Sequence, residues 1–381
     1  MRRLLPLVLL VLIPAPSTAL ADGCPLPCSG QRSSPPGAKL LYVQPQGPGG
    51  PMLAYDTATR RPFFELEPGL ASADGRAYFS TFHRGQRTRL WRWNVATGAP
   101  AGSRRLRGAW DVEAVSASGE RVALVRRRPD RTTVQVFDFQ RARTMHLLRL
   151  QGNFEVEAIS PDGEYLFLIQ HLAKRRYLVR QYDLLHERLV ARPLRAPGVK
   201  LMAGYAWSGI ASQDGRWLLT LYLSTARNSA FVHSLDLQRS KPVCIGLPSS
   251  GRFERLKRYS LTLEPGGQTL FAANPALGVI AEIDLTGSRV YRTTRFAPSR
   301  SGAAPRAATL STISRNGRTL YFSAGRDLWA YDVAYRLVRG PYATNGMIIG
   351  VGYGAKDRRI YAVRANGRML AFDAATGTRM G

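Results

Sequence analysis

Short runs of basic side chains are the part of this sequence best suited to chemistry, because guanidinium and ammonium groups in series bind anions. The formal net charge is +28, and such an excess favours association with anionic polymers or surfaces that weakens with salt. A solvated arginine-rich surface without a ligand is the alternative. Three runs supply the candidates for an anion-binding site: Arg84, Arg87, Arg89, Arg126, Arg127, Arg128, Arg131, Lys174, Arg175 and Arg176.

Patterns that would indicate catalysis or metal binding are weak. The five histidines are scattered, without the close spacing of metal-ligating pairs. The sequence contains no Gly-x-Ser-x-Gly turn and no glycine-rich phosphate loop. We therefore expect no catalytic residue, no metal and no cofactor. Few aromatic residues interleave the basic runs, which argues against single-stranded nucleic acid as the partner, and the expected secretion argues against DNA.

The cysteines are three in number, so at least one thiol is unpaired within a monomer, the oligomeric state that we expect. Cys24 and Cys28 lie in a Pro-rich segment, and a local disulfide between them remains open. Cys244 lies in an expected strand, where it is most simply a small buried apolar side chain.

A recurring phrase indicates the elements that must position these residues. It begins with Ser, ends with Gly, and precedes an apolar strand and then a second strand that ends at Asp or Asn. These ends follow one another at intervals of about 38 to 53 residues, the length of a four-stranded blade. One such unit cannot bury its own faces and must stack against neighbours. The clearest copies of the phrase are Ser72–Gly75, Ser116–Gly119, Ser160–Gly163, Ser212–Gly215 and Ser314–Gly317.

The sequence therefore predicts an all-β protein, a β-propeller over residues 39–381. Eight strand ends favour eight blades. Seven blades with an irregular closure, in which N-terminal strands complete the final blade, are the alternative. The aspartates of the repeat are expected to be structural, because their carboxylates accept backbone hydrogen bonds in turns. The eight strand ends are Asp56, Asn94, Asp138, Asp183, Asp236, Asp284, Asp332 and Asp373.

The repeat resembles those of known propeller families. Ser160–Phe167 resembles the Ser-Pro-Asp-Gly repeat of tryptophan–aspartate-like and TolB-like bacterial propellers, and the whole unit resembles YVTN and lactonase-like repeats. Leu370–Gly377 also resembles the quinoprotein repeat, but the pair of adjacent cysteines expected beside a pyrroloquinoline cofactor is absent. The lactonase-like resemblance implies, as the alternative function, a hydrolase with its site in the central funnel.

The propeller arrangement places the basic runs on one side of the ring. The turn between the second and third strands of a blade opens on the same side as the crossing to the next blade. Three consecutive blades would thus present a basic arc, joined by the segments 104–107 and 252–258. We predict a non-enzymatic binding or scaffolding module at the cell envelope, whose partner is an unknown protein or an anionic envelope polymer.

The first residues match a secretory signal peptide. Arg2 and Arg3 precede the apolar run Leu4–Ile13, and Ala19–Ala21 supplies small residues for cleavage. Removal of residues 1–21 would lower the net charge from +28 to +26 and leave a flexible Pro/Ser/Gly-rich tail, residues 22–38. We expect a secreted or periplasmic protein, with lipid attachment at Cys24 and twin-arginine export as alternatives. No later segment is apolar for long enough to span a membrane.

Overall fold

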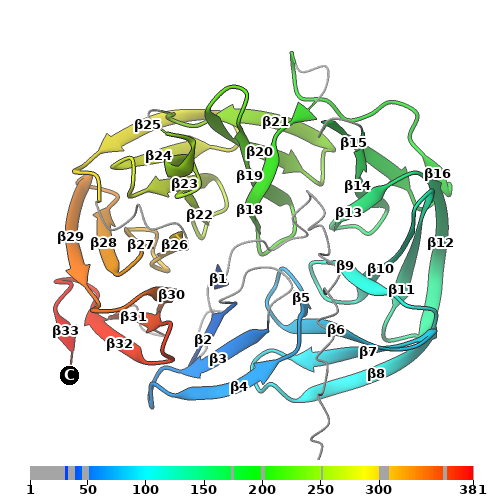
Figure 1. Ribbon diagram of the computed structural model, residues 1–381, viewed down its shortest axis with the longest axis horizontal. Helices are drawn as coiled ribbons and strands as arrows, with labels where there is room; N and C mark the ends of the chain where they lie inside the picture. The colour runs from blue at the N-terminus through cyan, green and yellow to red at the C-terminus, as the bar shows by residue number, and fades with distance from the viewer. Residues whose placement is uncertain are drawn as a thin grey trace, which may run out of the picture.

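The blades of a propeller are visible in the computed structural model, which describes residues 31–32, 39–44, 51–172, 176–198, 202–249, 252–299, 309–354 and 358–380. Eight antiparallel sheets surround a common centre, each built from four consecutive strands that run from the innermost to the outermost position (Figure 1). One sheet has an additional short strand. The predicted all-β propeller is therefore confirmed, with eight blades.

The first four blades occupy residues 31–203. Blade 1 contains β1 (Gln31–Arg32), β2 (Leu40–Val43), β3 (Met52–Asp56) and β4 (Pro62–Leu66). Blade 2 contains β5 (Gly69–Ala71), β6 (Ala77–Arg84), β7 (Arg87–Asn94) and β8 (Pro100–Arg107). Blade 3 contains β9 (Asp111–Val115), β10 (Arg121–Arg128), β11 (Arg131–Asp138) and β12 (Arg143–Gln151). Blade 4 contains β13 (Phe154–Ile159), β14 (Tyr165–His171), β15 (Arg176–Asp183) and β16 (Arg188–Leu189), with β17 (Met202–Ala203) added beside β15.

The other four blades complete the ring. Blade 5 contains β18 (Tyr205–Ala211), β19 (Trp217–Ser224), β20 (Ser229–Asp236) and β21 (Lys241–Gly246), and a short helix, α1 (Phe253–Leu256), follows it. Blade 6 contains β22 (Ser260–Leu263), β23 (Thr269–Asn274), β24 (Val279–Asp284) and β25 (Arg289–Arg295). Blade 7 contains β26 (Thr309–Ile313), β27 (Thr319–Ala324), β28 (Asp327–Asp332) and β29 (Leu337–Ala343). Blade 8 contains β30 (Ile348–Tyr353), β31 (Arg359–Arg364), β32 (Met369–Asp373) and β33 (Arg379–Met380).

The closure of the ring differs from one expected alternative. Strands β1 to β4 pair with one another, and β30 to β33 do the same, so N-terminal strands do not complete the final blade. Strand β1 lies within segment 22–38, for which the sequence predicts a tail; the other residues of that segment lie outside the described residues, as do residues 1–21. Over the described part of the chain, no helix has the length and hydropathy needed to cross a bilayer.

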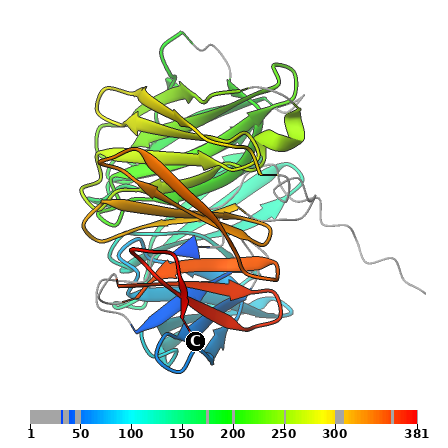
Figure 2. The same ribbon diagram turned by 90° about the vertical axis from the view of Figure 1, so that its left-hand side faces the viewer.

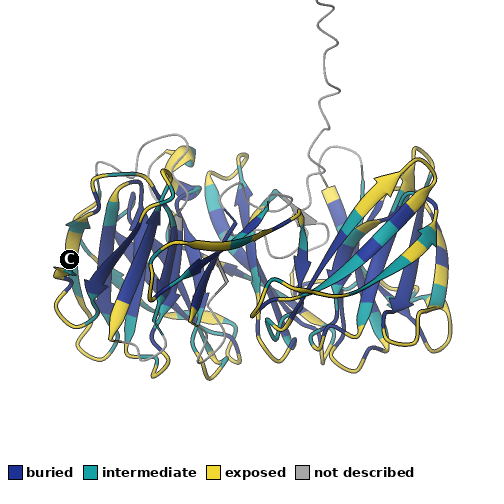
Figure 3. Cartoon of the chain, turned by 90° about the horizontal axis from the view of Figure 1, so that it is seen from below, coloured by how far each residue is buried: buried dark blue, intermediate teal, exposed yellow. Residues whose placement is uncertain are grey.

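Apolar packing between neighbouring blades holds the ring together. Eight clusters of buried side chains occur, one for each pair of neighbours. Phe79 of blade 2 and Phe139 of blade 3, for example, meet with their ring centres 5.5 Å apart. Figure 3 shows this burial in the middle of the blades, whereas outer strands and turns are exposed. Because inner strands are buried on both faces, their apolar residues do not alternate simply with polar ones.

The recurring phrase forms the turn between the first and second strands of a blade. In blade 4, the Ser160 hydroxyl accepts a bond from the Tyr165 N–H at 2.9 Å, and Asp162 accepts one from the Glu164 N–H at 2.9 Å. Gly163 has φ 75°, which favours glycine. Equivalent bonds occur at Ser72, Ser212 and Ser314. The phrase is therefore a self-contained turn, which explains its repetition.

Connections between strands open on two sides of the ring, as the edge-on view in Figure 2 shows. One side carries the turns of the recurring phrase. The opposite side, which we call the rim, carries the turns between second and third strands and the crossings to the next blade. On the rim, the turn of blade 2 contains Gly85 and Gln86, and the turn of blade 3 contains Pro129 and Asp130.

The strand-end aspartates hold the turns between the third and fourth strands. Asp138 accepts a hydrogen bond from the Arg141 N–H at 2.8 Å and one from the Arg141 guanidinium at 2.9 Å. Asp183 accepts one from the His186 N–H at 2.9 Å, and this bond lowers the pKa of Asp183. These contacts agree with the predicted structural role of the repeat aspartates.

Replacing Asp138 with Ala should therefore lower the free energy of unfolding by about 1–2 kcal/mol, because the Arg141 N–H and guanidinium lose their acceptor. Denaturant titration of the purified variant measures the change. The control is Asp130→Ala, which removes an exposed carboxylate from a rim turn. Equal stability of the two variants would show that the strand-end carboxylate has no structural role.

Candidate functional site

The basic residues of blade 2 gather on one face of its sheet. Arg84 pairs with Arg87 across the β6–β7 hairpin, and Arg87 pairs with Arg107 of β8. Arg89 pairs with Arg105 of β8 one row further from the rim. Directly paired residues project to the same side of a sheet, and so do residues two apart along a strand. We call these five residues, Arg84, Arg87, Arg89, Arg105 and Arg107, the arginine face.

The arginine face points toward blade 1 but extends beyond it. Tyr78 and Trp93, which lie on the same side of the sheet, pack into the apolar cluster between blades 1 and 2. Strands β6, β7 and β8 have eight residues each, whereas β2, β3 and β4 have four, five and five. Among the described residues of blade 1, the rim ends of the longer strands therefore have no equivalent strand in front of them. Arg84, Arg87, Arg105 and Arg107 are accordingly exposed, and Arg89 is half-buried.

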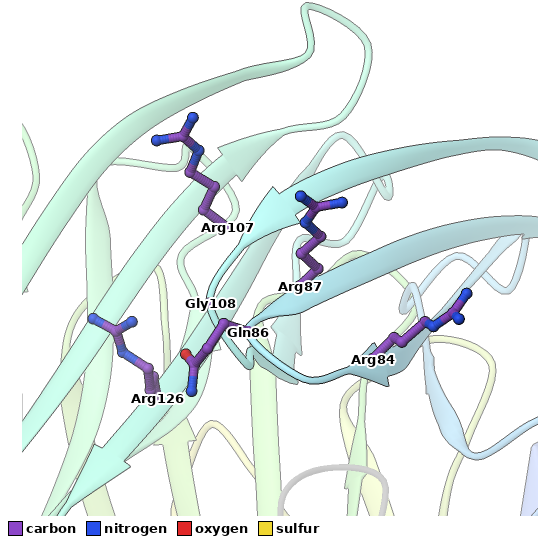
Figure 4. Close-up of a pocket in the computed structure, with 6 residues that line it drawn as sticks. All are labelled: Arg84, Gln86, Arg87, Arg107, Gly108 and Arg126. Carbon is purple, nitrogen blue, oxygen red and sulfur yellow. The ribbon is translucent and has the colours of Figure 1, made fainter.

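A pocket of about 650 Å³ lies at the rim beside this face, where blade 2 meets blade 3. Four arginines line it, together with one amide side chain and one glycine. Figure 4 shows Arg87 and Arg107 extending from the same side of the blade. None of the described residues that line it carries a carboxylate, so the electrostatic potential inside favours an anion. The lining residues are Arg84, Gln86, Arg87, Arg107, Gly108 and Arg126.

The far wall of the pocket is fixed by the crossing from β8 to β9. The Gly108 N–H donates to the Gln86 carbonyl at 2.7 Å, and the Thr88 hydroxyl donates to the Gly108 carbonyl at 2.7 Å. Trp110 donates its indole N–H to the Arg107 carbonyl at 2.6 Å. The Arg126 guanidinium carbon lies 5.0 Å from the centre of the Trp110 ring, a cation–π contact that orients Arg126.

Gly108 is required where Arg126 approaches the crossing. Its φ is 99°, and a Cβ atom at this position would lie 2.9 Å from Arg126 Nη1. A larger residue would therefore strain the backbone and displace the guanidinium. The same hydrogen bonds recur at the crossing from blade 3 to blade 4, where Thr132 and Gly152 replace Thr88 and Gly108. The arrangement therefore belongs to the fold, and in blade 2 it positions arginines.

The remaining candidates from the sequence have other surroundings. Arg127 faces away from the pocket and forms an ion pair with the buried Glu113. Arg128 and Arg131 pair across the β10–β11 hairpin, on the side that faces blade 2. Arg176 begins β15, and Lys174 and Arg175 lie outside the described residues. Of the predicted arc, the described residues thus bring together arginines of blades 2 and 3, and the arc as a binding site stays a prediction.

The two segments expected to join the arc, residues 104–107 and 252–258, contain regular secondary structure. Residues 104–107 belong to outer strand β8, and the Arg104 guanidinium carbon lies 4.7 Å from the centre of the Phe139 ring on the side of blade 3. Lys257 follows α1 and contacts Glu254 at 2.8 Å. Among the ion pairs found in the described residues, none includes a residue of the arginine face or Arg126.

Two aromatic residues lie among these arginines, which sequence analysis missed. Phe82 is paired with Arg89, and Trp91 lies two residues from Arg89 on the same side of β7. The Arg89 guanidinium carbon is 5.3 Å from the centre of the Trp91 ring. In the sequence, these aromatics precede or follow the basic runs. The aromatic residues and the arginines become neighbours only through the pairing of β6 with β7. The alternation of side chains along these two strands could have suggested this arrangement.

A second polar group lies among the inner strands of blades 3 and 4. Glu113 of β9 and Glu157 of β13 occupy register breaks at equivalent places in the two blades. Glu113 accepts the Val156 N–H at 2.9 Å, and Glu155 contacts His171 at 3.1 Å. Burial raises the pKa of Glu113 to about 7 and that of Glu157 to about 8. Neighbouring Glu155 raises both further by charge repulsion.

In the described part of the chain, no three His, Cys, Asp or Glu side chains gather as metal ligands would. Burial lowers the pKa of His233 to about 4 and raises that of the Cys244 thiol to about 11. Cys244 is therefore a thiol, not a thiolate, at neutral pH. Cys24 and Cys28 lie outside the described residues.

No family model and no curated protein matches the chain. Solved structures with the same fold include a dihydro-haem d1 dehydrogenase, NirN, with TM-score 0.56 and 13% identity over 93% of this chain and 74% of that one. The Dos1 propeller matches with TM-score 0.53 and 10% identity over 93% and 96% of the two chains. At such low identity the likeness extends to architecture alone. By its strands and by these neighbours, the protein is an eight-bladed β-propeller of the repeat type.

Proposed function

We propose that the protein is a non-enzymatic binding or scaffolding module that holds an anionic partner at the rim of blades 2 and 3. The observation that carries this proposal is the pocket lined by four arginines and no carboxylate. An arginine stays protonated throughout the physiological range, so it binds anions without acting as a general acid or base. Its planar fork suits carboxylate, phosphate and sulfate groups.

The place of action that we propose is the cell envelope. The N-terminal pattern of Arg2, Arg3 and the apolar run Leu4–Ile13 supports export. The excess of positive charge in an exported protein would favour its association with anionic polymers of the envelope or with acidic proteins. The partner we favour is an anionic envelope polymer.

A hydrolase is the second candidate, and the carboxylates of the inner strands favour it. Glu113 and Glu157 have raised pKa values of about 7 and 8, near the range in which a general acid or base operates. Each, however, is at most 8% exposed, and neither lines the rim pocket. Binding is therefore the function that the accessible groups support best.

The proposal predicts that reversing three charges of the pocket destroys polyanion binding. The variant Arg84→Glu/Arg87→Glu/Arg107→Glu should bind long-chain polyphosphate and polygalacturonate about 100-fold more weakly at low salt, since each arginine at an anionic surface contributes roughly 1 kcal/mol. Binding of the parent protein should weaken as salt is added. Affinities are measured by biolayer interferometry on immobilised polymer.

The control separates position from total charge. Arg318→Glu/Arg336→Glu/Arg358→Glu changes three exposed arginines in turns on the opposite side of the ring and alters the net charge by the same amount. This variant should retain most of the affinity. Equal losses in both triple variants would mean that the positive charge acts diffusely and that the rim is not a binding site.

A further inference from the structure

The arginine face contains one aromatic ring that is open to solvent. Phe82 is 66% exposed, although it lies within strand β6 and not in a loop. Its row of the sheet continues with Arg89 and Arg105, and the next row toward the rim consists of Arg84, Arg87 and Arg107. An exposed apolar ring bordered by guanidinium groups is typical of a site whose ligand has both an apolar face and charges.

Trp91 lies on the same side of the sheet, one row further from the rim, and is half-buried, so its ring is less open to a ligand than that of Phe82. One contact of its ring is with Trp93, at 5.4 Å between centres and 29° between planes. Another is with the Arg89 guanidinium. The Trp93 indole N–H is held by the Ser80 hydroxyl at 2.9 Å, so the stack is anchored in the sheet. Arg89 is thereby oriented before any ligand arrives, which reduces the entropy lost on binding.

We infer that the arginine face binds an acidic polysaccharide, with one sugar ring packed on Phe82 and its anionic groups bound by the two rows of arginines. This inference rests on the proposed function and specifies its ligand. A pyranose ring has an apolar C–H face that matches a phenyl ring. Carboxylate or sulfate groups on the neighbouring sugars match the guanidinium forks.

The arrangement favours a polysaccharide over the other polyanions. Single-stranded nucleic acid uses aromatic rings on which successive bases stack, whereas here one ring is exposed beside five arginines. A flat lipid surface would meet Arg84 and Arg87 first, since Phe82 lies two residues further from the rim along β6. A bare polyphosphate has no ring for Phe82 to contact. The density of charges around a single ring thus indicates an acidic sugar polymer.

The test compares polymers with and without rings. Affinity is measured for four probes: oligogalacturonate, long-chain polyphosphate, an oligothymidylate and vesicles of phosphatidylglycerol. Phe82→Ala should weaken oligogalacturonate binding about ten-fold, from the lost burial of one phenyl ring, and leave polyphosphate binding unchanged. Phe82→Tyr should restore oligogalacturonate binding. The control is Phe63→Ala, which removes a ring that is 57% exposed on β4 of blade 1.

The outcomes distinguish this inference from the proposed function. If the triple arginine variant no longer binds polyphosphate or oligogalacturonate while Phe82→Ala binds both as the parent does, the rim binds anions and the polysaccharide assignment is wrong. If Phe82→Ala weakens oligothymidylate or vesicle binding more than oligogalacturonate binding, the assignment is also overturned. If the triple variant keeps its affinity for every polyanion, the proposed function itself is wrong. Thermal unfolding of each variant verifies that the fold is intact.

Discussion

The unfolding free energy of the Glu157→Gln variant should depend less on pH than that of the parent protein, and the part that remains should come from Glu113, whose pKa is also raised. Glu157 is buried in β13, and its Oε2 atom has no hydrogen-bond partner among the described residues. Burial raises its pKa from 4.5 to about 8. The native carboxyl thus keeps its proton at pH values where the unfolded chain has lost it, so stability falls as pH rises from about 5 through 8.

The expected size of this loss is roughly 3–5 kcal/mol, from 1.36 kcal/mol for each unit of pKa difference. Gln preserves the shape and the neutral state, so the variant should match the parent near pH 5 and exceed it in stability near pH 9. Urea titrations across this range measure the slopes. Glu164→Gln, which changes an exposed carboxyl of the same blade, is the control. Identical slopes for the parent and Glu157→Gln would contradict the assignment.

Replacing Glu282 with Ala should be among the most destabilising single changes in the ring. This side chain of β24 is fully buried and accepts hydrogen bonds from the Tyr331 hydroxyl at 2.7 Å and the Tyr291 hydroxyl at 3.0 Å. It also contacts the Arg292 guanidinium at 3.2 Å. Tyr331 belongs to blade 7, so the carboxylate links two blades. Its removal takes away the shared acceptor of these three groups, although the Tyr331 hydroxyl keeps its contact with Thr294 at 3.0 Å, and leaves a cavity between the blades, at a cost of about 2–4 kcal/mol.

Exposed ion pairs provide the comparison for this variant. Glu254→Ala breaks the contact with Lys257 at the surface, and its effect should stay below about 1 kcal/mol. Glu282→Gln retains an acceptor and should fall between the two. Chemical denaturation gives all three values. A Glu282→Ala variant as stable as Glu254→Ala would mean that the buried carboxylate is not a structural link.

The fold could be predicted because its signals are local. The Ser-x-Asp-Gly phrase closes its own turn with bonds spanning two to five residues, so each copy in the sequence marks one blade. The aspartate ending each unit is equally local. Ring closure could not be predicted, because blade 1 lacks the phrase and β1 has only two residues in a segment rich in Pro and Gly.

The candidate site could be predicted only in part. Arg84, Arg87 and Arg126 were found as basic runs, and all three line the pocket. Alternation along β10, however, turns Arg127 toward Glu113 and away from Arg126. The positions of Phe82, Arg105 and Arg107 beside Arg89 and Arg87 depend on the register of three strands. Their exposure depends on the short strands of blade 1, and no sequence pattern within blade 2 could have predicted it.

The boundary between blades 8 and 1 has a mechanical consequence. Leu41 and Val43 of β2 pack there against Tyr361 and Val363 of β31, and no strand pairs across it in the described residues. At the other seven boundaries the polypeptide itself continues from one blade to the next. The molecule is in this sense a split ring: among the described residues, this one boundary is held by side-chain packing alone, so we expect it to open first under force. Blade 2, with its arginine face, lies one blade from that split.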